Sequence, residues 1–142
     1  MNQGTHAGLL EKDETLDLHH AHIFASDIDV TIAWWQRHLG ARILFDGENA
    51  GARNVMLGVG RGRLNLYDQP PRDNARGVVH HLGIRVNGLR DVWARLQADG
   101  VTSPNGLREQ DAWRYVMIAA PDNLLLELFE FDDPTAPFNI DG

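Results

Sequence analysis

Two short segments of this chain carry apolar residues at every second position. In "AHIFA" these residues are Ala21, Ile23 and Ala25, and in "LGIRV" they are Leu82, Ile84 and Val86. Alternation with a period of two predicts a strand that has one apolar face. The residues between them, such as His22 and Gly83, then project from the opposite face.

A segment with helical spacing follows each predicted strand. In the first, Ser26 or Asp27 can cap the start and Gly40 ends the helix; in the second, Asn87 can cap and Gly100 ends it. The apolar positions that form one face of each helix are Ile28, Ile32, Trp35 and Leu39, and then Leu89, Val92, Trp93 and Leu96. Three shorter apolar runs, separated by turn-forming residues, complete each half of the chain.

The two halves are an internal repeat with a shift of 61 residues (81 − 20). This shift sets "ARNVML" (52–57) on "WRYVMI" (113–118) and, within one residue, "RLNLYD" (63–68) on "LLELFE" (125–130). The pattern predicts an α+β fold of two βαβββ modules, which form an open, curved mixed sheet around a cavity. We expect a leader at 1–17, modules at 18–69 and 78–132, a linker at 70–77 and a tail at 133–142, all within one domain.

Alternation also sorts the polar residues of these strands by face. His20 and His22 lie opposite the apolar side of the first strand, as do His81 and Arg85 in its repeat. Leu126 and Leu128 are core positions, so Glu127 and Phe129 point the other way, and Asn65 and Tyr67 are their counterparts in the first module.

A divalent metal gives the simplest reason for a carboxylate within "LLLELF". A buried carboxylate without a partner costs several kcal/mol or is neutralised by a shift in pKa. Binding of one ion by His20, His81 and Glu127 removes that cost and leaves coordination positions for a substrate. The competing interpretation is a pair of hydrogen-bonded structural histidines and a solvated glutamate.

Other residues on this face are candidates for catalysis or for the substrate pocket. Glu127 or His22 could act as the base, since both project toward the predicted cavity. Arg85 could pair with an anionic substrate group or be a solvated rim residue. Tyr67, Tyr115 and Phe129, with Asn65, could line the pocket, or the aromatic residues could serve ordinary packing.

Composition excludes several classes of protein. The chain of 142 residues has a formal charge of −7, which argues against nucleic acid or an anionic membrane as the main partner. It has no cysteine, so thiolate chemistry is excluded, and its one lysine, Lys12, lies in the leader. No segment looks like a signal peptide or a membrane span, so we expect a cytoplasmic protein.

At residues 18 to 131 the sequence resembles the vicinal oxygen chelate superfamily, which includes glyoxalases, bleomycin-resistance proteins and extradiol dioxygenases. The motifs are "HAHIFASDID", "WWQRHLGARI", "GVVHHLGIRV" and "DNLLLELFEF". The resemblance implies one divalent metal (Ni, Co, Zn, Mn or Fe(II)) held by His20, His81 and Glu127, a small-molecule substrate chelated through two adjacent oxygens, and a homodimer. Glyoxalases and the related epimerases place Glu or Gln where this chain has Asn65, which weakens a glyoxalase I assignment.

The leading functional hypothesis is a metal-dependent lyase or isomerase of glyoxalase type that stabilises an enolate. One alternative is a small extradiol-type Fe(II) dioxygenase. Another is a drug-binding resistance protein without catalysis, although the retained ligand triad counts against it.

Overall fold

The computed structural model describes residues 13–14, 16–49, 51–75 and 77–135. The first module contains β1 (Ala21–Phe24), α1 (Ile28–Leu39), β2 (Arg42–Asn49), β3 (Ala52–Val59) and β4 (Gly62–Tyr67). The second contains β5 (Leu82–Arg85), α2 (Leu89–Ala98), β6 (Arg108–Glu109), β7 (Trp113–Ala120), the 3-10 turn η2 (Pro121–Asn123) and β8 (Leu124–Phe131). The predicted order βαβββ, repeated once, is confirmed.

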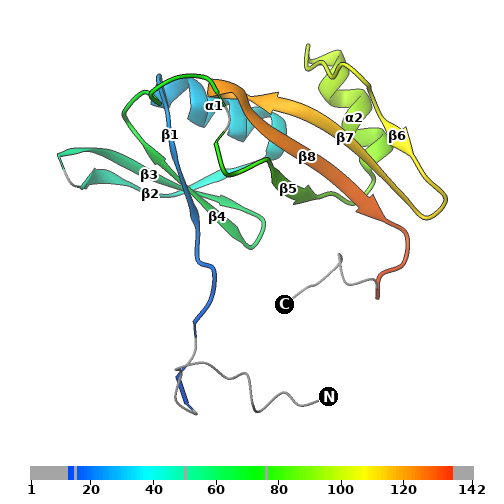
Figure 1. Ribbon diagram of the computed structural model, residues 1–142, viewed down its shortest axis with the longest axis horizontal. Coiled ribbons are helices and arrows are strands. Elements are labelled where there is room, and N and C mark those ends of the chain that lie inside the picture. Colours follow the sequence, from blue (N-terminus) through cyan, green and yellow to red (C-terminus); the bar gives the residue numbers. More distant parts are fainter. Residues whose placement is uncertain (1–12, 15, 50, 76, 136–142) are drawn as a thin grey trace.

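The strands form two four-stranded sheets of the same topology. Sheet A has the order β1-β4-β3-β2 and sheet B the order β5-β8-β7-β6. In each sheet the first strand of the module runs parallel to the last, and the remaining pairs are antiparallel. Figure 1 shows sheet A on the left and sheet B on the right, and the strand orders make β1 and β5 end strands of their sheets.

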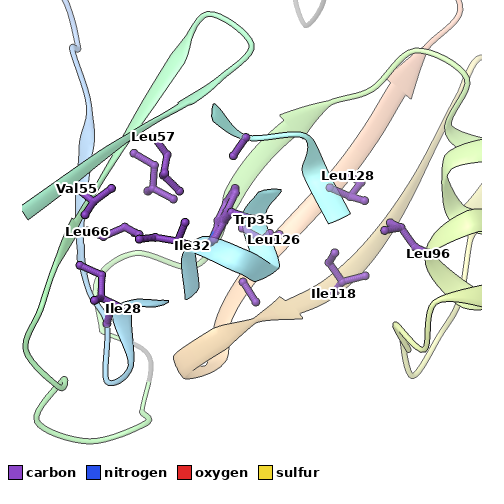
Figure 2. Packing of buried hydrophobic residues seen from close by; sticks show 14 of the residues in the cluster. Ile28, Ile32, Trp35, Val55, Leu57, Leu66, Leu96, Ile118, Leu126 and Leu128 are labelled. Carbon is purple, nitrogen blue, oxygen red and sulfur yellow. The ribbon is translucent and has the colours of Figure 1, made fainter. Parts of the chain in front are cut away.

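One hydrophobic core runs through both modules. Trp35 of α1 is 1% exposed, and Ile28 and Ile32 on the same helix face are also buried. Figure 2 shows Ile32 and Trp35 between the core residues of sheet A and those of sheet B. The helix therefore packs on both sheets, which fixes the position of one module against the other.

Two polar contacts also join the modules. The Arg37 guanidinium at the end of α1 donates two hydrogen bonds to Asp99, which follows α2. The Ser26 backbone N–H donates to Asp122 at 3.1 Å, and the Ser26 hydroxyl donates to the same carboxylate. The pKa of Asp99 lies below its usual range because the Arg37 side chain donates hydrogen bonds to it.

The helix ends test the capping predictions. Asp27 caps α1 by accepting a hydrogen bond from the Val30 N–H at 3.2 Å, and Gly40 ends this helix with a φ of 66°. The prediction that Asn87 caps α2 is wrong, because the cap residue is Gly88 and it makes no side-chain cap bond. The Glu130 carboxylate instead accepts from the N–H groups of Gly88 and Leu89 at 2.7 and 3.1 Å. Glu130, which lies far along the chain on β8, thus caps the start of α2 in place of a local side chain.

Arg114 is a buried charge that the alternation pattern alone did not single out. It lies on the core side of β7, 3% exposed, and its guanidinium donates to Glu130 at 3.0 Å and to Asp132 at 2.8 Å. Burial by itself raises the pKa of Glu130, but the hydrogen bonds from Gly88, Leu89 and Arg114 outweigh it and lower the pKa. This network ties the start of α2 to sheet B.

Much of the predicted leader (1–17) and of the predicted tail (133–142) lies outside the described residues. Within the described part, neither helix has the length and apolar character required to cross a membrane.

Candidate metal centre

His81 and Glu127 lie together on the face of sheet B that points away from the helices. In both sheets this face is called the outer face. Gly83 pairs with Glu127 across β5 and β8, and His81 lies two residues before Gly83 on the same side. The distance from His81 Nε2 to Glu127 Oε1 is 3.6 Å, and both side chains are about one-third exposed or less. This is longer than a hydrogen bond, but two ligands about 2.1 Å from one tetrahedral ion lie roughly 3.4 Å apart. The separation therefore fits a shared ion.

His20 comes directly before β1, as His81 comes directly before β5. It lies two residues before His22, which pairs with Asn65 across β1 and β4. By strand register, His22 thus corresponds to Gly83, and Asn65 corresponds to Glu127. The predicted equivalence of the two histidines is built into the topology of the repeat.

Each of these histidines contacts the histidine that precedes it. The Nδ1 atoms of His19 and His20 are 2.9 Å apart, and those of His80 and His81 are also 2.9 Å apart. In each pair one ring must donate and the other accept. Histidines that bind metals usually hold their second ring nitrogen in a hydrogen bond, most often to a carboxylate, a backbone carbonyl or water, which fixes the ring and its tautomer; here the partner is the preceding histidine. His19 and His80 were not predicted to have this role of orienting the next histidine, although the repeated "HH" pairs are visible in the sequence.

One chain brings together only two of the three predicted ligands. Among residues 13–14, 16–49, 51–75 and 77–135, no group of three His, Asp or Glu side chains could hold a metal ion. His20 lines a cleft of about 930 Å³ between the modules, and Gly83 and Arg85 line the same cleft from β5. The triad of His20, His81 and Glu127 is therefore not assembled within one chain.

Asn65 has an unsatisfied oxygen at the position that corresponds to Glu127. Its Oδ1 atom is buried and has no hydrogen-bond partner among the described residues. An acceptor left in this state costs about 1–3 kcal/mol. A ligand that offers a donor or a positive charge would remove that cost, so this atom supports the idea that sheet A contributes to a binding site.

The predicted pocket residues divide between the two outer faces. On sheet A, the ring of Tyr67 lies edge-on to His22, with centroids 5.7 Å apart, and beside Phe24. On sheet B, Tyr115 pairs with Phe129, and Phe129 pairs with Arg85, in the row next to Glu127. Of these residues only Arg85 lines the cleft that contains His20. In a single chain the predicted pocket residues thus form two groups, one on each sheet.

The comparison with protein families places the chain in a known superfamily. Residues 17–128 match the family model "Glyoxalase/Bleomycin resistance protein/Dioxygenase superfamily", and the chain belongs to this superfamily. The superfamily includes metal-dependent enzymes, and its duplicated module is the one seen here. Among curated proteins, no relative matches the chain.

Several solved structures share this fold at low identity. A glyoxalase family protein from Enterococcus faecalis is 24% identical, with a TM-score of 0.66, over 80% of this chain and 97% of that one. A mutant of the fosfomycin resistance protein FosX from Listeria monocytogenes, complexed with Mn(II) and 1S,2S-dihydroxypropylphosphonic acid, is 16% identical. Its TM-score is 0.70, over 83% of this chain and 94% of that one. A glyoxylase/bleomycin resistance protein/dioxygenase domain from Frankia sp. EAN1pec is 18% identical, with a TM-score of 0.67, over 83% and 93%.

Proposed function

We propose that this protein is a divalent-metal-dependent enzyme of glyoxalase type, a lyase or isomerase that acts on a small oxygenated metabolite. The observation that carries the proposal is the His81–Glu127 pair, whose 3.6 Å separation suits a shared ion, together with His20 at the equivalent place on the duplicated module. The Mn(II) in the structure of the FosX mutant is consistent with a metal in this fold.

In this proposal, the third ligand of each site is His20 from a second copy of the chain. The strands β1 and β5 are the end strands of their sheets, so each has one edge without a neighbour in its sheet. An exposed edge is a template for pairing with another chain. In a dimer with two-fold symmetry, β1 of one copy would lie beside β5 of the other. That arrangement supplies His20 of one copy to His81 and Glu127 of the other, and forms two equal sites.

The chemistry then divides between the ion and the side chains. A bound divalent ion supplies a Lewis acid that polarises a carbonyl and acidifies the adjacent C–H. His22 projects from the outer face of sheet A beside Asn65, where its imidazole can accept a proton from the substrate carbon. Glu127 is the alternative base, and Arg85, in the row next to Glu127, can orient an anionic group of the substrate.

A second candidate is an extradiol-type Fe(II) dioxygenase. Asn65 stands where glyoxalases have a Glu or Gln ligand. The proposed protein ligands are therefore two histidines and one carboxylate, the set typical of non-haem Fe(II) oxygenases. Fe(II) in the purified protein, with oxygen-dependent loss of activity, would favour this candidate over the lyase or isomerase.

Elemental analysis of the purified, tag-free protein tests the metal-dependent function. We expect close to one divalent ion per chain in the parent, and loss of that ion in His20→Ala, His81→Ala and Glu127→Ala. Glu109→Ala is a matched control for Glu127→Ala and should keep the metal, since Glu109 lies on β6 opposite Arg114 and pairs with Arg90. A parent without metal, even after exposure to Fe(II), Ni(II), Co(II), Mn(II) and Zn(II), would overturn the proposal.

A further inference from the structure

The outer face of sheet B carries a row of aromatic rings next to Glu127. Trp113 stacks on Tyr115, with centroids 5.0 Å apart, and on Phe131, at 5.2 Å. Phe131 in turn contacts Phe129 edge-on at 5.9 Å. All four residues are half-buried in the single chain. The rings form one apolar wall that begins in the row beside the His81–Glu127 pair.

The duplicated module shows that the fold does not require this wall. By strand register, Tyr115 corresponds to Asn54 on sheet A, and Phe129 corresponds to Tyr67. The repeat shift sets Trp113 on Ala52. The same βαβββ topology is thus built on sheet A with one aromatic residue at these positions instead of three. The additional rings need a reason other than the stability of the module.

Gly83 leaves an open space in front of this wall. It pairs with Glu127, and a Cβ atom added to it would meet only the Phe129 ring, at an ordinary contact distance of 3.5 Å. Its φ is not positive, so the backbone does not require glycine there. A glycine within a strand weakens it and often marks a place where a ligand approaches closely. The corresponding residue on sheet A is His22, which fills this space with an imidazole.

We propose that the outer face of sheet B binds the planar, apolar ring of the substrate, with Gly83 as the floor and Phe129 as the wall. Trp113, Tyr115 and Phe131 act as positioning residues, because their stack holds the Phe129 ring in place. The oxygen-bearing end of the ligand then points toward Glu127 and His81. This inference rests on the proposed function and narrows it to substrates that carry an aromatic or similarly flat ring next to the carbon atoms that bear the two vicinal oxygens.

The test compares two 2-hydroxy acids that share the same oxygen-bearing end. (S)-Mandelate carries a phenyl ring where (S)-lactate carries a methyl group. Dissociation constants are measured by NMR titration of the full chain, with Zn(II) and without metal. Burial of the phenyl ring against an aromatic wall predicts at least about tenfold tighter binding of mandelate than of lactate by the Zn(II) protein. Without metal both acids bind more weakly, and the preference for mandelate remains.

Substitutions then test whether the outer face of sheet B causes the preference for mandelate. Gly83→Leu fills the floor and should reduce the ratio of the two dissociation constants to near one, and Phe129→Leu should lower it in the same direction. Gly83→Ala, whose Cβ fits without a clash, should give an intermediate ratio. Trp34→Leu removes an aromatic ring of α1 that contacts Trp35 and His38 and should leave the ratio unchanged.

The outcomes separate this inference from the proposed metal centre. Equal affinities for the two acids, or no binding of either, would overturn the ring-binding face, while metal content measured on the same samples reports on the metal centre. A preference for mandelate that survives Gly83→Leu and Phe129→Leu would place the ring elsewhere and would also overturn the proposal.

Discussion

Coexpression of two defective variants tests whether the metal centre is shared between two copies. His20→Ala removes the proposed ligand on sheet A, and Glu127→Ala removes a proposed ligand on sheet B. Alone, each variant lacks a ligand at both sites of its homodimer. In a heterodimer purified through two different tags, one site combines the intact His20 of one chain with the intact His81 and Glu127 of the other. The second site lacks two ligands.

The symmetry of the dimer sets the size of the expected effect. The heterodimer should hold about half of the parent's metal per dimer, because one of its two sites is complete. Each homodimer should hold close to none under the same conditions. Elemental analysis of the dual-tagged fraction, with protein quantified by amino-acid analysis, separates these values.

A matched pair of variants provides the control. His81 and Glu127 lie together on sheet B of one chain, with Nε2 and Oε1 3.6 Å apart. The heterodimer of His81→Ala and Glu127→Ala therefore has one ligand missing at each site and should show no recovery of metal. Recovery in this control as well as in the first pair, or in neither, would refute the shared site.

Three further predictions concern residues around the site and the core. His80→Ala should weaken metal binding about 10- to 100-fold in a competition titration with a chelator, because the His81 ring loses the contact that orients it; unchanged affinity would show that this contact has no such role. Asn65→Leu should raise the free energy of unfolding of the metal-free protein, measured by urea denaturation, by about 1 kcal/mol or more, because the buried Oδ1 has no partner. A clear loss of stability would show that Oδ1 is not an unsatisfied acceptor. Because the pKa of Glu130 is lowered from its ordinary value of 4.5, its ionised carboxylate stabilises the fold above pH 4.5, and this contribution is lost as the pH falls through the lowered pKa. Glu130→Gln should therefore flatten the acid side of the plot of stability against pH, and an unchanged plot would refute that role.

The sequence predicted the fold because the main signals were local and repeated. Period-two alternation at Ala21 to Ala25 and at Leu82 to Val86, followed by helical spacing, is enough to define strand and helix in each module. The same alternation placed Glu127 and Phe129 opposite the core residues Leu126 and Leu128, which are 0% exposed in the structure. Duplication then supported the pattern, since an error in one module would have to be repeated in the other.

Features that depend on distant contacts could not be predicted in the same way. Glu130 caps α2 by accepting hydrogen bonds from two N–H groups that lie 41 and 42 residues earlier in the chain, so no local pattern marks this cap. Likewise, strand alternation assigns His20 and His81 to equivalent faces but does not say whether the two faces of one chain meet. That depends on how α1 and the core position the two sheets, which is a property of the whole fold.

X-ray absorption spectroscopy of the Zn(II)-loaded protein addresses the metal centre most directly. The account predicts two imidazole nitrogens at about 2.0–2.1 Å, with carboxylate or water oxygen completing the coordination shell. His20→Ala or His81→Ala, loaded at high Zn(II), should each show one imidazole. A parent spectrum with no imidazole, or with a single imidazole that persists in both variants, would contradict the metal centre of His20, His81 and Glu127.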